Sequence, residues 1–318
     1  MSDRVGDGAF IYREDTHWAR LPRGWSFREV ADVAVDSRDR VFVFCRGEHP
    51  VIIFDRDGNF LDSWGDGMFH RPHGLTIGPD DSLYCVDDLD HSVRKFSPDG
   101  KLLLTLGERG RPAPRHSGLP FNQPTKAALE PGTGAIYVAD GYGNAAVHKF
   151  SPEGDLMFSW GRFGTDPGEF NLVHSVCTDQ EGRVYVADRE SHRIQIFDPR
   201  GRYITQWNNL HRPCGLHISR EAPQRVYIGE LPPSLAVNMH YTRLGARLTV
   251  HDLEGRRLAA VGADTPGEEK PGQFIAPHGM AVDSRGDLYL GEVAYTFFGA
   301  ALDPPREPRC LRKLTRQG

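Results

Sequence analysis

VHSVCTDQEGRVYVADRESHRIQIFDPRGR, residues 173–202, is the stretch that decides the fold. It contains three short runs rich in β-branched and aromatic residues, and turns containing Asp, Gly or Pro separate the runs. Runs of this composition are typical of β-strands, and Pro and Gly in the intervening segments favour tight turns. The stretch therefore predicts three consecutive short strands.

The same pattern recurs along the chain about every 40 to 60 residues, a period typical of propellers and solenoids. The first strands of the successive copies begin at Val30, Pro72, Pro124, Val173, Pro213 and Pro277. A second and a third strand follow each, and a fourth ends several copies with SWG or TLG. Four strands repeated six times predict an all-β protein, a six-bladed β-propeller in a single domain over residues 1–318. The copies resemble NHL repeats.

The two ends of the chain complete each other in this pattern. The last copy stops after its third strand, CLRKLT (310–315), and the N-terminal segment AFIYRED (9–15) belongs to no copy of its own. We expect the N-terminal segment to form the outer strand of the sixth blade. Pairing of the N- and C-terminal strands would then close the ring of blades.

Composition excludes several classes of partner. The chain is 39% hydrophobic and 25% charged, with a net charge of −5 spread over its length, so a polycationic surface for nucleic acid is not expected. The N-terminus has no secretory signal pattern, and no apolar run is long enough to span a membrane. Five cysteines without paired spacing fit a reducing compartment. We expect a cytoplasmic protein with a small-molecule substrate and no membrane or nucleic-acid partner; the oligomeric state stays open.

Three histidines occupy one position of the repeat. Aligning the first strands places Ala31, His73, Thr125, His174, Cys214 and His278 in equivalent positions. His73, His174 and His278 therefore lie in alternate copies, about a third of a turn apart in a six-bladed ring. The innermost strands line the channel, so three imidazoles at one height would form a trigonal set of donors.

Such a set predicts a catalytic metal site. Three His with an open fourth position is a known arrangement for zinc, and other divalent transition metals also bind it. The alternative is that the three are unrelated residues of repeat turns. Cys214 holds the same slot in the fifth copy, but it falls between the histidine-bearing blades and is expected to be a small buried residue.

The turns after the second strands carry a second set of chemically active residues, which on a propeller face the channel mouth and the substrate. These residues are Arg46, Asp88, Tyr142, Arg189, Glu230 and Glu292. A solvated ring of turn charges is the alternative interpretation, above all for Glu230 and Glu292.

Several motifs resemble the peptidyl-α-hydroxyglycine α-amidating lyases, which are NHL-repeat propellers. The resemblance covers most of the chain and is strongest in these motifs: HRPHGL (70–75), FNQPTKAALEPGTGAIYVADGYGN (121–144), PGEFNLVHS (167–175), VADRESHRIQIF (186–197) and APHGM (276–280). The family's zinc ligands match His73, His174 and His278. Its active-site tyrosine matches Tyr142, and its arginines match Arg46 and Arg189.

The resemblance implies a zinc-dependent lyase that cleaves the N–C bond of an α-hydroxylated amide to an amide and an aldehyde such as glyoxylate, without redox change. It implies that Tyr142 takes the proton of the substrate hydroxyl, and that Arg46 and Arg189 orient a carboxylate or carbonyl. The substrate is expected to be a small non-peptide molecule.

The chain departs from the family at four places. Asn122 and Gly143 stand where the family has one cysteine pair, and the second pair is also absent. Ala276 replaces a methionine near the third zinc ligand. Gly279 replaces an aspartate beside a structural calcium, which argues against calcium here.

Two other functions stay open. One is a metal-dependent hydrolase of an ester, lactone or amide that uses zinc-bound water, and the other is a non-enzymatic NHL propeller that binds a ligand or protein. The long segments 231–245 and 293–308 are either lids over the channel, with Tyr241, Phe297 and Phe298 as candidate substrate contacts, or plain insertions.

Overall fold

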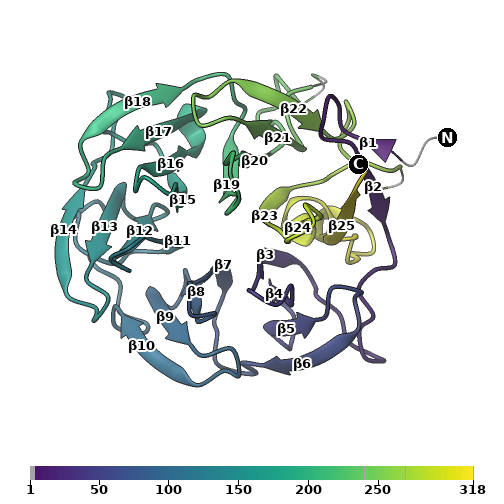
Figure 1. Ribbon diagram of the computed structural model, residues 1–318, viewed down its shortest axis with the longest axis horizontal. Helices are drawn as coiled ribbons and strands as arrows, with labels where there is room; N and C mark the ends of the chain where they lie inside the picture. The colour runs from purple at the N-terminus through teal and green to yellow at the C-terminus, as the bar shows by residue number, and fades with distance from the viewer. Residues whose placement is uncertain (1–3, 240, 242, 269, 318) are drawn as a thin grey trace. The chain divides into compact units, whose positions relative to one another are not determined.

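The computed structural model describes residues 4–239, 241, 243–268 and 270–317. The chain forms two compact units, one of Gly67–Arg220 and the other of Met1–Asp66 with Glu221–Gly318. The predicted fold class is confirmed, because the strands form six antiparallel sheets of a six-bladed β-propeller (Figure 1). Helical residues among the described ones are confined to short segments: η1 (Arg189–Ser191), α1 (Ala294–Phe297) and η2 (Gly299–Ala301).

The unit Gly67–Arg220 contains three complete blades and one further strand. Their strands are β7 (Pro72–Ile77), β8 (Leu83–Asp87), β9 (Ser92–Phe96), β10 (Leu102–Leu106), β11 (Pro124–Leu129), β12 (Ile136–Asp140), β13 (Ala146–Phe150), β14 (Leu156–Trp160), β15 (Val173–Thr178), β16 (Val184–Asp188), β17 (Arg193–Phe197), β18 (Tyr203–Trp207) and β19 (Pro213–Ile218). The first strands β7, β11, β15 and β19 pack against one another in that order.

The other unit contains the first blade, most of the fifth and the sixth. Its strands are β1 (Arg4–Val5), β2 (Tyr12–Asp15), β3 (Val30–Val35), β4 (Val41–Cys45), β5 (Val51–Phe54), β6 (Phe60–Trp64), β20 (Val226–Glu230), β21 (Arg247–His251), β22 (Arg257–Val261), β23 (Pro277–Val282), β24 (Leu288–Glu292) and β25 (Leu311–Arg316). β20, β21 and β22 belong to the fifth blade and pair antiparallel in that order.

The sixth blade joins the two ends of the chain as predicted. Its strand order is β1-β2-β25-β24-β23, and β2 pairs antiparallel with β25 so that Tyr12 faces Arg316 and Glu14 faces Leu314. The two-residue strand β1, which pairs with β2, was not predicted. The N-terminal segment therefore completes this blade.

The inner three strands of each blade are mostly buried, and the outermost strand of the first five blades is largely exposed or half-buried. Every residue of β3 and β4 is buried, whereas all residues of β6 and β14, and all of β10 except Leu106, are exposed or half-buried. In the unit Gly67–Arg220, one core cluster joins the third and fourth blades through Val147, Phe170 and Val186. The inner strands are apolar on both faces because a neighbouring blade covers each face.

An acidic residue at the end of the second strand holds the loop before the first strand of the same blade. Asp87 accepts hydrogen bonds from the backbone N–H groups of His70 and Arg71 at 2.6 and 2.9 Å. Asp140 does the same for Asn122, and Asp188 for Asn171. Because the loop and the turn that follows the acid are fixed together, the residues after the second strand hold defined positions.

Candidate metal and substrate site

The two histidines of the unit Gly67–Arg220 each lie on a β-bulge. Pairing of β7 with β8 shifts register between Pro72 and Gly74, and pairing of β15 with β16 shifts between Val173 and Ser175. The extra residues are His73 and His174. A bulge takes a residue out of the regular ladder and redirects its side chain.

Each imidazole is fixed by a hydrogen bond to the next blade. His73 Nδ1 lies 2.8 Å from the carbonyl oxygen of Thr125, and His174 Nδ1 lies 3.0 Å from that of Cys214. A carbonyl can only accept, so Nδ1 carries the proton in both rings and the lone pair is on Nε2. Metal-binding histidines in proteins are commonly oriented in this way.

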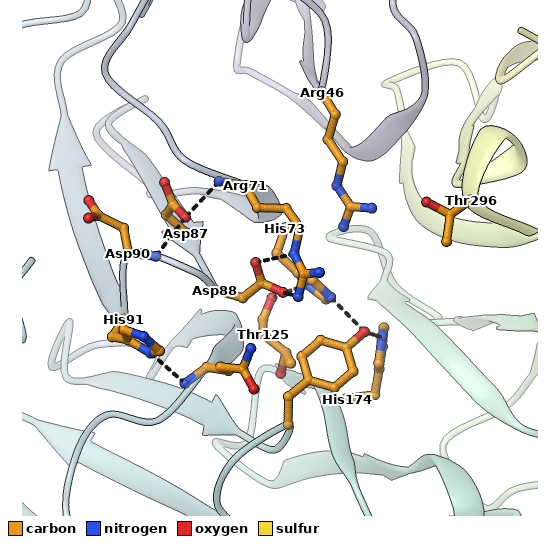
Figure 2. Close-up of polar contacts among 12 residues, drawn as sticks. Arg46, Arg71, His73, Asp87, Asp88, Asp90, His91, Thr125, His174 and Thr296 are labelled. Carbon is orange, nitrogen blue, oxygen red and sulfur yellow. Dashed lines mark hydrogen bonds and ion pairs between the residues drawn. The ribbon is translucent and has the colours of Figure 1, made fainter. Parts of the chain in front are cut away.

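Both Nε2 atoms meet the hydroxyl of Tyr142. The distances from this oxygen are 3.1 Å to His73 and 3.0 Å to His174, and the two imidazole centroids are 5.0 Å apart (Figure 2). Both histidines are 2% exposed, and Tyr142 is half-buried. The two Nε2 lone pairs and the hydroxyl oxygen therefore converge at one point with little access to bulk water on the histidine side.

This donor set fits a divalent metal ion. A tyrosine hydroxyl has one proton and can donate it to only one of the two Nε2 lone pairs. The second contact would then bring two lone pairs together, which is unfavourable in a buried place. A cation that takes up both Nε2 lone pairs removes the conflict, and neutral imidazoles are ligands that zinc and similar metals accept.

Two guanidinium groups flank Tyr142. Arg189 lies 5.6 Å from the ring centroid and its Nη1 is 3.5 Å from the hydroxyl, while Arg71 lies 6.0 Å from the centroid. The Arg189 guanidinium also donates to Glu190 at 2.7 Å. Burial alone would lower the pKa of Arg189, but the nearby Tyr142, Cys214 and Glu190 outweigh it, so its pKa is raised and the side chain stays charged.

Arg71 was missed by the sequence analysis. It lies two residues before His73 in HRPHGL, and its guanidinium makes a two-pronged ion pair with Asp88, with Nε 2.7 Å from Oδ1 (Figure 2). This hydrogen bond is the main reason why the pKa of Arg71 is raised. Its place within the motif HRPHGL was the available signal, but arginine is common in turns and Arg71 lies outside the equivalent positions of the repeat.

Cys214 belongs to the wall around His174. Its Sγ lies 3.3 Å from His174 Nδ1, the nitrogen already bonded to the Cys214 carbonyl, and 3.7 Å from Nε2. The thiol therefore packs against the imidazole ring and lies closer to Nδ1, which carries the proton, than to Nε2, which carries the lone pair. This agrees with its expected role as a small buried residue.

The other unit holds His278 and Arg46. Pairing of β23 with β24 shifts register between Pro277 and Gly279, so His278 also lies on a bulge, and its Nδ1 is 2.6 Å from the Ala31 carbonyl oxygen. His278 thus repeats the arrangement of the other two histidines. Arg46 donates to the buried Glu29 at 2.8 Å, and Glu29 also accepts from the backbone and hydroxyl of Thr296.

Two further members of the predicted second ring have interior roles. Glu230 is fully buried and accepts from Arg247 at 3.0 Å and from Thr249. Glu292, also fully buried, accepts from Arg312 at 2.8 Å and from the backbone of Ile275. Neither is a solvated turn charge, and each is fully engaged by partners in its own unit.

The long segments contribute exposed aromatic rings. Tyr241 is 64% exposed, and Phe297 and Phe298 are about equally exposed at 40% and 41%. Residues 240 and 242 of the first segment lie outside the described residues. Contact of these rings with a substrate stays a prediction.

Comparison with known proteins identifies relatives in sequence. A family model described as the NHL repeat matches residues 170–197. NHL repeat-containing protein 3 of Homo sapiens is 31% identical over 306 residues, which cover 89% of this chain and 82% of that protein. Peptidyl-alpha-hydroxyglycine alpha-amidating lyase 1 of Drosophila melanogaster is 36% identical over 253 residues, which cover 74% of this chain and 45% of that protein. The match to peptidylglycine alpha-amidating monooxygenase of Rattus norvegicus, at 33% identity, spans 53% of this chain and 20% of that protein.

Solved structures share the fold at low sequence identity. A gluconolactonase from Xanthomonas campestris is 13% identical with a TM-score of 0.63, covering 100% of this chain and 96% of that one. A virginiamycin B lyase from Staphylococcus aureus is 13% identical with a TM-score of 0.58, covering 89% and 82%. These likenesses show the architecture alone. Within the described residues, no helix has the length and apolar character needed to cross a membrane.

Proposed function

Because the chain belongs to the NHL-repeat family that includes human NHL repeat-containing protein 3 and the peptidyl-α-hydroxyglycine α-amidating lyases, we propose that it is a metal-dependent carbon–nitrogen lyase. The observation that carries the proposal is the meeting of two Nδ1-anchored imidazoles at the hydroxyl of Tyr142. Its substrate is a small α-hydroxylated amide, R–CO–NH–CH(OH)–R′.

The metal ligands in this proposal are His73, His174 and His278. The first two converge within their unit, and His278 is assigned by its equivalent repeat position and by the same bulge and the same Nδ1 bond to a carbonyl. Zinc is the preferred ion, because neutral imidazoles in this number suit it. A bound divalent metal would supply Lewis acidity toward the substrate oxygen.

The protein groups would carry the proton and orient the substrate. Tyr142, acting in its deprotonated phenolate form, takes the proton of the substrate hydroxyl; the electron pair left on oxygen forms the aldehyde C=O, and the C–N bond breaks. The amide nitrogen then receives a proton, so one carbinolamide gives one amide and one aldehyde without net oxidation. Arg189, held charged beside Tyr142, and Arg46 bind the carboxylate or carbonyl of the substrate.

We further propose that the protein works in a reducing compartment, the cytoplasm. None of the five cysteines forms a disulfide. Burial also raises the pKa of the Cys45 thiol to about 12, which keeps this thiol in its less reactive protonated form.

The direct test is aldehyde release from α-hydroxyhippurate, whose cleavage gives benzamide and glyoxylate. The wild-type protein should release both products in equal amounts. Tyr142→Phe should retain the metal and lose about 10²- to 10⁴-fold in kcat, the range typical of general acid–base groups. Release at the wild-type rate by this variant would contradict the role of Tyr142.

The same assay separates the two other candidate functions. Hydrolysis of an ester, lactone or amide panel without aldehyde release from the carbinolamide would support the hydrolase. If the protein holds no metal and turns over neither the carbinolamide nor the ester, lactone and amide panel, the result would support a binding protein.

A further inference from the structure

The turn Gly141–Asn144, which carries Tyr142, is held by a loop from the same unit. We call residues 113–122 the clamp loop. His116 N donates to the Gly143 carbonyl at 3.0 Å, and the Arg115 guanidinium donates to the Tyr142 carbonyl at 3.3 Å. Tyr142 N itself makes only a long hydrogen bond, 3.4 Å, to the Gln123 carbonyl. The position of the turn therefore depends on contacts from this loop.

Asn122 is the centre of these contacts. It is 7% exposed, its carbonyl accepts from Gly143 N at 2.9 Å, and its Nδ2 donates to the Ala113 carbonyl at 2.6 Å. A Cβ on Gly143 would overlap Asn122 Oδ1, so the carboxamide fills the space directly beside the turn. Asn122 thus contacts the turn through its backbone and its side chain together.

Asp140 ties both sides of the turn to one buried carboxylate. Asn122 N lies 3.0 Å from each of its oxygens, and Asn144 Nδ2 donates to Oδ2 at 2.8 Å. The same Asn144 Nδ2 donates to the Leu119 carbonyl at 2.8 Å, which returns to the clamp loop. Asp140 is fully buried, where such charge-assisted hydrogen bonds are strong and hard to replace with water.

We propose that Asn122 is a positioning residue that fixes the Tyr142 hydroxyl between the two imidazoles through the Gly143 turn. The proposal rests on the proposed function for its catalytic consequence. The phenol must hold contacts of 3.1 and 3.0 Å with two rigid rings, so a small shift of the turn misplaces it. Misplacement of a reacting group by about 1 Å costs on the order of 10²-fold in rate.

The test is Asn122→Ala, which removes the bond to Ala113 and empties the space beside Gly143. We expect kcat to fall about 10- to 100-fold while KM and metal content change less than threefold. Hydrogen exchange of the amides in residues 141–144 should become at least tenfold faster, because the turn loses its support.

Thr178→Val is the matched control. Thr178 lies in the same unit and loses a comparable side chain to backbone hydrogen bond, 2.7 Å to the Leu129 carbonyl, far from the Tyr142 turn in the chain. It should lower the melting temperature about as much as Asn122→Ala and leave kcat and exchange of residues 141–144 unchanged.

Two outcomes in Asn122→Ala overturn the proposal: unchanged hydrogen exchange, or faster exchange with unchanged kcat. A proportional fall of kcat in Thr178→Val would also overturn it, because general destabilisation would then explain both variants. A wild-type protein without aldehyde release contradicts the proposed function instead, and the exchange measurement then still reports whether Asn122 holds the turn.

Discussion

At the scale of single residues, repeat equivalence predicted the ligand histidines, but their orientation required the structure. His73, His174 and His278 could be found because identical slots in successive copies can be compared along the sequence. The Nδ1 hydrogen bond to the next blade could not be predicted in this way, and neither could the bulge. The carbonyl that accepts the bond lies about 40 to 50 residues away in the chain for His73 and His174, and 247 residues away for His278. Arg71 was missed because it lies outside the repeat positions and its role depends on the ion pair with Asp88.

Cys214 offers a prediction at this scale. Cys214→Ala should retain the metal of the wild-type protein, because the sulfur lies beside His174 Nδ1, which carries a proton. The backbone carbonyl that orients His174 is unchanged by the substitution. Elemental analysis measures the result, and a loss of metal comparable to that of a ligand variant would show that the thiol is a ligand.

His217 predicts a pH dependence of stability. Burial, reinforced by the positive charges of Lys126 and Arg220, lowers the pKa of His217 to about 3. Below about pH 6.5 the unfolded chain binds a proton at this site that the folded chain does not bind until about pH 3. The free energy of unfolding should therefore fall with decreasing pH in this window.

Denaturant titrations of His217→Gln from pH 7 to pH 4 measure this contribution. The free energy of unfolding should change less steeply with pH in His217→Gln than in the wild type, by up to about 1.4 kcal/mol per pH unit. His17→Gln, a change at an exposed histidine, is the control and should follow the wild type. Equal slopes for His217→Gln and the wild type would contradict the assignment.

At the scale of elements, most strands could be predicted because each is a short apolar run between turn residues. β1 was missed because its two residues, Arg4 and Val5, carry no pattern. α1 was also missed, since the four residues AYTF favour strand and helix about equally and tertiary contacts decide. Glu29 provides such contacts, because it accepts from the backbone and hydroxyl of Thr296.

The junction of β2 with β25 contains a buried charge cluster. Glu14 lies 2.7 Å from Arg312, which is fully buried and also pairs with Glu292 at 2.8 Å. Glu14→Ala should lower the free energy of unfolding by about 3 kcal/mol, because it leaves a buried guanidinium with one partner fewer. Arg13→Ala, on the exposed face of the same strand, should change it by less than about 0.5 kcal/mol. Equal effects of the two variants in denaturant titrations would show that the cluster does not secure this junction.

At the scale of the whole molecule, the proposed metal ligands and substrate-binding residues come from both units. Tyr142, His73 and His174 belong to one unit, and His278 and Arg46 to the other. The fold class could be predicted from the sequence because six copies of one pattern have few architectures open to them. The substrate could not, because segments 231–245 and 293–308 match no repeat and carry most of the exposed aromatic rings that would contact it.

Metal content of the purified protein and of four single variants tests the central claim most directly. His73→Ala, His174→Ala and His278→Ala should each lose the metal, which the wild type should hold at about one ion per chain. His251→Ala is the matched control, because His251 is also buried with Nδ1 3.2 Å from a carbonyl, that of Gly255, but lies outside the repeat slot. It should retain the metal. Full metal content in His278→Ala, or no transition metal in the wild type after loading, would contradict the claim.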